Sequence, residues 1–168
     1  ACAPAQRTDS TGVLGVSVSE ESDNRDLVGI TAFSSEVSGD TVLYTLTGRT
    51  SGGWLTNGSS TGIVTVADAT KIDFESAPGH AYGVTVQASD GTLTSSQTFS
   101  IAVTDVAPSQ PTDSNGVTGG SVSEGAANGD LVGITAASTD VNGGKVTYPL
   151  PGDTSGGRRT IVSCYGVV

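Results

Sequence analysis

The stretch Asp26-Leu27-Val28-Gly29-Ile30-Thr31-Ala32 occurs twice in this chain, the second time unchanged as residues 130–136. The offset is 104 residues, and it relates the two copies without a gap as far as the last residue. Of the 64 positions that can be compared in this way, 36 are identical. The chain therefore reads as a tandem repeat, with one whole copy and a second copy that covers about three-fifths of a repeat.

The repeat also sets the expected domain boundaries. We expect residues 1–106 to form a linker followed by a complete repeat, and residues 107–168 to form a partial repeat. Residues 1–7 correspond to residues 105–111, which lie between the two copies. We therefore expect the chain to be a piece of a longer array of repeats.

Composition narrows the classes of function. The formal net charge is −10, from 17 acidic and 7 basic residues, which argues against partners such as nucleic acid or an anionic membrane surface. We find neither an apolar run long enough to span a membrane nor a signal peptide in the sequence. The two cysteines, Cys2 and Cys164, correspond to Val106 and Ser60 in the other copy, so they do not form a repeated disulfide framework. The 24 glycines and the many serines and threonines are typical of a β-rich secreted module.

Short segments with alternating apolar and polar residues predict β-strands. Asp90-Gly91 predicts a hairpin turn between the last two of them. The expected fold is all-β, an antiparallel immunoglobulin-like sandwich. The predicted strands of the first copy are residues 13–19, 26–31, 41–46, 62–66, 83–88 and 98–103. The predicted core consists of Val16, Val18, Ile30, Tyr44, Leu46, Val64, Ile72, Val84, Val86, Phe99 and Ile101.

The second copy departs from this pattern toward its end. It has no counterparts of residues 83–103, so we expect an incomplete sandwich with exposed strand edges. Pro149 and Pro151 replace two strand threonines, and Arg158 and Arg159 replace Trp54 and Leu55. We expect residues 140–168 to be stabilised by another chain or another copy, or to be poorly ordered.

The order of several short motifs resembles that of a cadherin repeat, most closely the cadherin-like repeats of large bacterial surface and secreted proteins. The resemblance covers the first copy and the available part of the second. The motifs are Val18-x-Glu20, Val42-x-Tyr44-x-Leu46, Thr61-Gly62-x-Val64-Thr65-Val66, Ile72-Asp73-Phe74-Glu75, Ala88-Ser89-Asp90-Gly91 and Phe99-x-Ile101-x-Val103-x-Asp105.

In that family, calcium ions lie between consecutive repeats and are held by carboxylates of both repeats. Calcium takes six to eight oxygen ligands, so such a site needs several carboxylates in one place. The resemblance implies calcium ligands at the junction of the two copies, and a weaker second set at the other end of the first copy. The junction set is Glu20, Asp73, Glu75, Asp105, Asp140 and Asn142, and the weaker set is Glu36, Asp40 and Asp90.

One departure from the family pattern bears on this site. Ala107-Pro108-Ser109 stands where the family linker has Asn-Asp-Asn, so a carboxylate and an amide are missing. The site would therefore hold fewer ions, or bind them more weakly. The same acids also have a simpler interpretation as surface charges, and Glu20 and Glu124 as charges that discourage strand-edge pairing.

The remaining candidate residues give weaker indications of a functional site. The single histidine, His80, is a poor basis for a serine-type catalytic site, and one histidine with two unrelated cysteines does not make a zinc site. Asn57-Gly58-Ser59 matches a glycosylation acceptor but is first a turn signal. The aromatic residues Trp54, Tyr82 and Phe33 could form a platform for sugar rings, although core packing explains Trp54 better, since Arg158 replaces it in the second copy.

The sequence thus predicts a non-enzymatic, extracellular adhesion or spacer repeat that calcium stiffens. Its expected partners are neighbouring repeats or further copies of itself. The alternatives are a polysaccharide-binding module and a passive spacer within a secreted enzyme or toxin.

Overall fold

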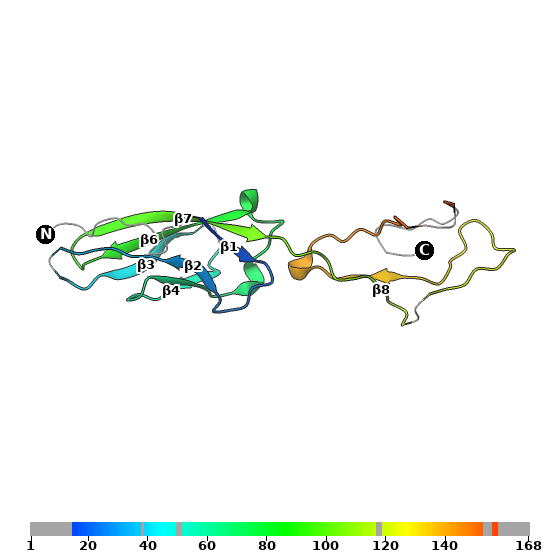
Figure 1. Cartoon of the computed structure of the whole chain (residues 1–168), viewed down its shortest axis with the longest axis horizontal. Helices are drawn as coiled ribbons and strands as arrows, with labels where there is room; N and C mark the ends of the chain where they lie inside the picture. Colours follow the sequence, from blue (N-terminus) through cyan, green and yellow to red (C-terminus); the bar gives the residue numbers. More distant parts are fainter. Residues whose placement is uncertain (1–14, 38, 50–51, 117–118, 153–155, 158–168) are drawn as a thin grey trace. The chain divides into compact units, whose positions relative to one another are not determined.

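The computed structural model of the chain describes residues 15–37, 39–49, 52–116, 119–152 and 156–157. It divides into two units, Ala1–Val106 and Ala107–Val168. Strands fill the first unit, whereas loops make up most of the described part of the second (Figure 1). The predictions for residues 1–14, Cys2, Cys164, Arg158 and Arg159 lie outside the described residues.

The described residues of the first unit form seven strands in two sheets. One sheet has the order β1-β7-β6-β3 and the other has the order β2-β5-β4. All six predicted strands are present, with shifted ends, and the short β4 is an addition that alternation did not reveal. The strands are β1 Gly15–Ser19, β2 Leu27–Thr31, β3 Leu43–Arg49, β4 Leu55–Asn57, β5 Ile63–Val66, β6 Ala81–Ser89 and β7 Thr94–Thr104. Two short 3-10 helices, η1 Ala69–Lys71 and η2 Pro78–His80, lie between β5 and β6.

The pairing of β1 with β7 is parallel, with Gly15 opposite Ser100 and Ser19 opposite Thr104. All other strand pairs of this unit are antiparallel, so the prediction of an antiparallel sandwich is correct except at this edge. Because β6 runs against β7, β1 and β7 finish at the end of the sandwich where β6 begins. We call this the linker end, and we call the opposite end, where residues 90–93 join β6 to β7, the hairpin end.

Alternating residues of both sheets meet in one core. Along β6 the side chains alternate between half-buried and buried from Ala81 to Ser89, as the period of a strand requires. Nine of the eleven predicted core residues are buried, and Val16 and Leu46 are half-buried at its margin. The largest side chain of the core is Trp54, which is fully buried.

The described part of the second unit does not form a second sandwich. Its described strands are the two-residue β8 Thr112–Asp113 and β9 Ala136–Ala137, which pair with each other, followed by the 3-10 helix η3 Val141–Gly143. None of its described residues is buried. The repeat in the sequence is therefore not matched by a repeat of the whole fold in the described residues.

Local contacts, in contrast, recur at the same offset. The Tyr44 hydroxyl accepts a hydrogen bond from the Ser34 N–H at 3.0 Å, and the Tyr148 hydroxyl accepts one from the Ser138 N–H at 3.2 Å. The turn before β2, in which the Asp26 carboxylate accepts the Asp23 N–H at 2.8 Å, is repeated where the Asp130 carboxylate accepts the Ala127 N–H at 2.8 Å. Contacts that need only nearby residues thus form in both copies.

The difference has a simple cause in the strand pairing. In the first unit β1 pairs with β7, β2 with β5 and β3 with β6. The sequence contains no second counterparts of β6 and β7. Pro149 adds a further obstacle, since its counterpart Thr45 lies in β3 opposite Gln87 of β6 and a proline there has no N–H to donate.

Asp90, in the turn at the hairpin end, should make the stability of the fold depend on pH in the acid range. Asp90 accepts hydrogen bonds from the N–H groups of Leu93 at 2.7 Å and Thr92 at 2.8 Å. These bonds, that from Leu93 first, lower the pKa of Asp90 below its ordinary value of 3.8. A carboxylate with a lowered pKa contributes stability above its unfolded pKa, and that contribution is lost as the pH falls through the folded pKa.

We therefore predict that Asp90→Ala lowers the melting temperature at pH 7 and that this difference shrinks as the pH falls below about 4. Thermal unfolding followed by circular dichroism between pH 7 and pH 2 measures it. Asp90→Asn keeps a side-chain acceptor and is the control, with a smaller loss at pH 7. A difference that stays constant through the acid range would contradict the prediction.

Candidate metal site

Three carboxylates meet at the linker end of the sandwich. Glu20 directly follows β1, and Asp73 and Glu75 lie in the segment between η1 and η2. Each offers a carboxylate oxygen, and these three oxygens all lie within 4.8 Å of one another. Three of the six residues expected at the junction are therefore brought together within one unit, and we call them the carboxylate cluster.

Glu20 is the buried member of the cluster, with 2% of its surface exposed. One carboxylate oxygen accepts the N–H of Phe74 at 3.2 Å, and the other accepts the N–H of Val106 at 2.8 Å. Its own N–H donates to the carbonyl oxygen of Thr104 at 3.3 Å. Glu20 thus ties the end of β1 both to the segment that carries Asp73 and Glu75 and to the chain leaving β7.

The segment of Asp73 is itself a fixed turn. The Asp73 carboxylate accepts the Ser76 N–H at 3.1 Å, and the Asp73 carbonyl accepts the Ala77 N–H at 3.1 Å and the Tyr82 hydroxyl at 3.4 Å. The hydrogen bond from the Ser76 backbone is the main cause that lowers the pKa of Asp73 below its ordinary value of 3.8. Asp73 is therefore ionised at neutral pH, which is the form that a metal ion requires.

Carboxylates at such distances repel one another. At 4.8 Å and an effective dielectric constant of about 20, the Coulomb energy of one pair of unit charges is roughly 3 kcal/mol. A bound divalent cation would reverse the sign of this interaction. A carboxylate has about four lone pairs, so it can accept a hydrogen bond and bind a cation at the same time.

The remaining expected ligands lie elsewhere in the chain. Asp105 is exposed and follows β7 directly, next to Val106. Asp140 and Asn142 belong to the second unit, where the Asp140 carboxylate accepts the Gly144 N–H at 3.1 Å and Asn142 has a left-handed backbone with φ 60°.

The weaker set lies at the hairpin end. Asp90 belongs to the turn between β6 and β7, and Glu36 and Asp40 lie between β2 and β3. Within the ranges that the structure describes, the carboxylate cluster is the one group of acidic, histidine or cysteine side chains close enough to share an ion. Glu36, Asp40 and Asp90 do not form such a group there.

Two of the three aromatic residues that were considered for a sugar platform are buried. Trp54 is 0% exposed and Tyr82 is 6% exposed, and the two rings pack edge to face with centroids 5.5 Å apart. Their role is core packing, as the replacement of Trp54 by Arg158 in the second copy suggested. Phe33, in contrast, is 47% exposed.

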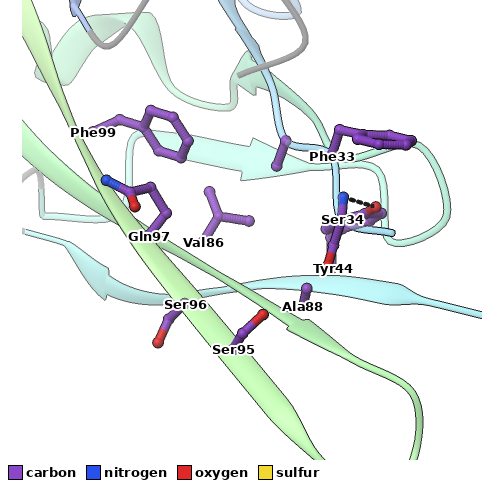
Figure 2. Close-up of a pocket in the computed structure, with 10 residues that line it drawn as sticks. Phe33, Ser34, Tyr44, Val86, Ala88, Ser95, Ser96, Gln97 and Phe99 are labelled. Carbon is purple, nitrogen blue, oxygen red and sulfur yellow. Dashed lines mark hydrogen bonds between the residues drawn. The ribbon is translucent and has the colours of Figure 1, made fainter. Parts of the chain in front are cut away.

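A hollow at the hairpin end does not replace that platform. It is lined by residues near the ends of β2 and β6, at the start of β3 and in the first half of β7, among them Phe33, Tyr44 and Phe99 (Figure 2). Its inner volume is about 20 Å³, which suffices for about one water molecule. A sugar ring does not fit there.

Two features of the site were not predicted from the sequence. The first is the backbone of Val106, whose N–H holds Glu20; backbone donors carry no sequence signal. The second is His80, whose ring stacks on Phe74, between the two acids of the segment. Asn57, which matched a glycosylation acceptor but was interpreted first as a turn residue, donates from its side-chain amide to the Tyr44 carbonyl at 2.9 Å, which is a structural role.

The burial of Glu20 gives a prediction that does not depend on any ion. Glu20→Ala leaves the N–H groups of Phe74 and Val106 without this acceptor, and each unpaired buried group costs about 1–3 kcal/mol. We expect a clear loss of stability in urea unfolding with a chelator present. The exposed neighbour Glu21 provides the control Glu21→Ala, which should change stability by less than about 0.5 kcal/mol. Equal effects of the two variants would refute the role of Glu20.

No protein-family model matches the chain, and no curated protein matches it. Solved structures do. Domains EC1-2 of human protocadherin-24 match 96% of this chain and 78% of that chain at 17% identity, with a TM-score of 0.55. Domains EC22-24 of mouse cadherin-23 match 93% of this chain and 50% of that chain at 19% identity, with a TM-score of 0.53. For Drosophila N-cadherin EC1-4 the shares are 77% and 33% at 21% identity, with a TM-score of 0.52, so the chain spans a third of that structure. These similarities show that the chain has a cadherin-like fold.

Proposed function

We propose that the chain is a calcium-stabilised extracellular adhesion or spacer module without enzymatic activity. The observation that carries the proposal is the carboxylate cluster of Glu20, Asp73 and Glu75 at the linker end, with Glu20 buried and bound to the chain that leaves β7. The order of the sequence motifs, closest to the repeats of bacterial surface and secreted proteins, and the cadherin-like fold support the same function.

Calcium is the cation that suits these ligands. It is a hard ion that prefers carboxylate and carbonyl oxygens and accepts six to eight of them in flexible geometry. Three carboxylates supply at most six oxygens, and Asp105, which follows β7, is proposed as a further ligand. Asp140 and Asn142 remain part of the proposal through the sequence resemblance. A typical structural zinc site uses cysteine and histidine ligands, and the cluster contains neither.

The geometry of Glu20 suggests how an ion would act on the chain. The same side chain that belongs to the cluster accepts the N–H of Val106, the last residue of the first unit. An ion that neutralises the repulsion among the carboxylates would strengthen the arrangement that fixes Glu20, and hence the direction in which the chain leaves β7. Calcium would thereby stiffen the segment that follows the sandwich, which is what a spacer or an adhesive array needs.

The alternatives are less well supported. Polysaccharide binding lacks an aromatic platform, because Trp54 and Tyr82 are buried. Among the described helices, none has the length and apolar character needed to cross a bilayer. A passive spacer differs from an adhesive module in its partners, since adhesion between copies requires self-association.

We predict that millimolar calcium raises the melting temperature of the protein relative to a chelator. A ligand at about 100 times its dissociation constant stabilises the folded state by about 2.7 kcal/mol, and each kcal/mol is worth about 4–8 °C in a domain of this size. Asp73→Asn combined with Glu75→Gln should abolish the rise. Differential scanning calorimetry measures these changes.

The matched control is Glu21→Gln combined with Asp68→Asn. It also removes two negative charges from the linker end, but neither residue belongs to the cluster, so the calcium-dependent rise should persist. The absence of a rise in the unmodified protein, or an equal loss in both double variants, would refute the calcium site. Sedimentation velocity of the same samples separates the two functions, since adhesion between copies requires calcium-dependent oligomers and a spacer remains monomeric.

A further inference from the structure

The single histidine of the chain contacts the segment that carries Asp73 and Glu75, at the same residue as Glu20. His80 is the last residue of η2, and its Nδ1 lies 2.9 Å from the carbonyl oxygen of Phe74. Because a carbonyl can only accept, Nδ1 carries the proton and donates. The imidazole also stacks on the Phe74 ring, with centroids 3.9 Å apart and an angle of 10° between the planes.

Phe74 is the residue between the two acids of the segment. Its N–H is bound by the Glu20 carboxylate and its carbonyl by His80. Both peptide groups that flank Phe74 are therefore oriented, one by each partner. These peptide groups connect Phe74 to Asp73 and to Glu75, so their orientation determines where the two carboxylates point.

The backbone of His80 indicates that its ring has a role at this place. His80 has φ 57° and follows Gly79 with φ 63°, which is the left-handed region that glycine adopts without a penalty and other residues adopt rarely. The side chain is exposed, so burial does not explain the histidine. The two contacts with Phe74 are the interactions that hold His80 in this unfavourable backbone conformation.

We propose that His80 is a positioning residue, which sets the calcium affinity of the carboxylate cluster by orienting Phe74 and does not contact the ion. The inference rests on the proposed function, because it assumes that calcium binds to Asp73 and Glu75. Partners that orient metal ligands typically change metal affinity by about 10–100-fold when they are removed. Two contacts on the residue between two ligands place His80 in that class.

Three variants distinguish the effects of the two side-chain contacts from the effect of the backbone conformation. His80→Gly removes the ring and the hydrogen bond and relaxes the left-handed residue. His80→Asn removes the ring but keeps an N–H donor at the same distance from the backbone, and asparagine tolerates this conformation. The control Thr92→Gly introduces glycine at an exposed position in the turn at the hairpin end.

Calcium affinity is measured by isothermal titration calorimetry, and the melting temperature with and without calcium is measured in parallel. We expect His80→Gly to weaken calcium binding roughly tenfold or more, His80→Asn to restore part of this loss, and Thr92→Gly to bind like the unmodified protein. The calcium-dependent rise in melting temperature should shrink in the same order. A purely structural role would instead lower the melting temperature equally in calcium and in chelator and leave the affinity unchanged.

The outcomes distinguish this inference from the proposed function. If the unmodified protein binds calcium and His80→Gly binds it equally well, the positioning role is refuted and the calcium site stands. If the unmodified protein binds no calcium, the proposed function fails and the inference falls with it. Weaker binding in His80→Gly without any recovery in His80→Asn would leave the ring stacking as the positioning contact and reject the hydrogen bond.

Discussion

The structure depends on one constraint, which is that the first three strands of the sandwich pair with strands that come later in the chain. β1 pairs with β7, β2 with β5 and β3 with β6. The first unit contains all of these partners and closes a core around Trp54. The second unit shares the early part of the sequence, yet its described residues form only local contacts, such as that of Tyr148 with Ser138, and the short pair of β8 and β9. Local sequence determines the turns, whereas the sheets require residues far apart in the chain.

The same constraint builds the candidate site. Glu20 comes at the end of β1 and Val106 shortly after the end of β7, and the parallel pairing of these two strands brings them together. The Asp73–Glu75 segment reaches the same end because η1 and η2 connect β5 to β6 there. The three carboxylates thus come from two separate parts of the chain, and the backbone of a third part, at Val106, holds one of them.

The sequence predicted the bounds of β2 and β5 to within one residue, whereas β7 begins four residues before the predicted range 98–103. It missed β4, which has only three residues, too few to show alternation. It also undervalued Trp54, since alternation does not extend to a residue just before so short a strand. For the second unit the sequence predicted an incomplete sandwich, and the described residues there form only the two-residue strands β8 and β9.

For the site, the motif Ile72-Asp73-Phe74-Glu75 pointed to two of the three clustered acids, and the motif ending in Glu20 pointed to the third. The sequence could not indicate that Glu20 is bound by the backbone of Val106, because every residue type except proline offers that donor. It considered His80 only as a catalyst or a zinc ligand and set both roles aside. The sequence could not reveal the stacking of His80 on Phe74, because this contact depends on the left-handed backbone of residues 79 and 80.

The parallel pairing of β1 and β7 has a mechanical consequence. Tension transmitted through the domain enters at the start of β1, at the hairpin end, and leaves at the end of β7, at the linker end. The two strands are then pulled in opposite directions along their common axis, so the hydrogen bonds between residues 15–19 and 100–104 are loaded in shear and must break together. Strands pulled apart from one end would release their bonds one after another, like a zipper. The topology therefore places a shear-resistant clamp between the two points at which force acts on the domain.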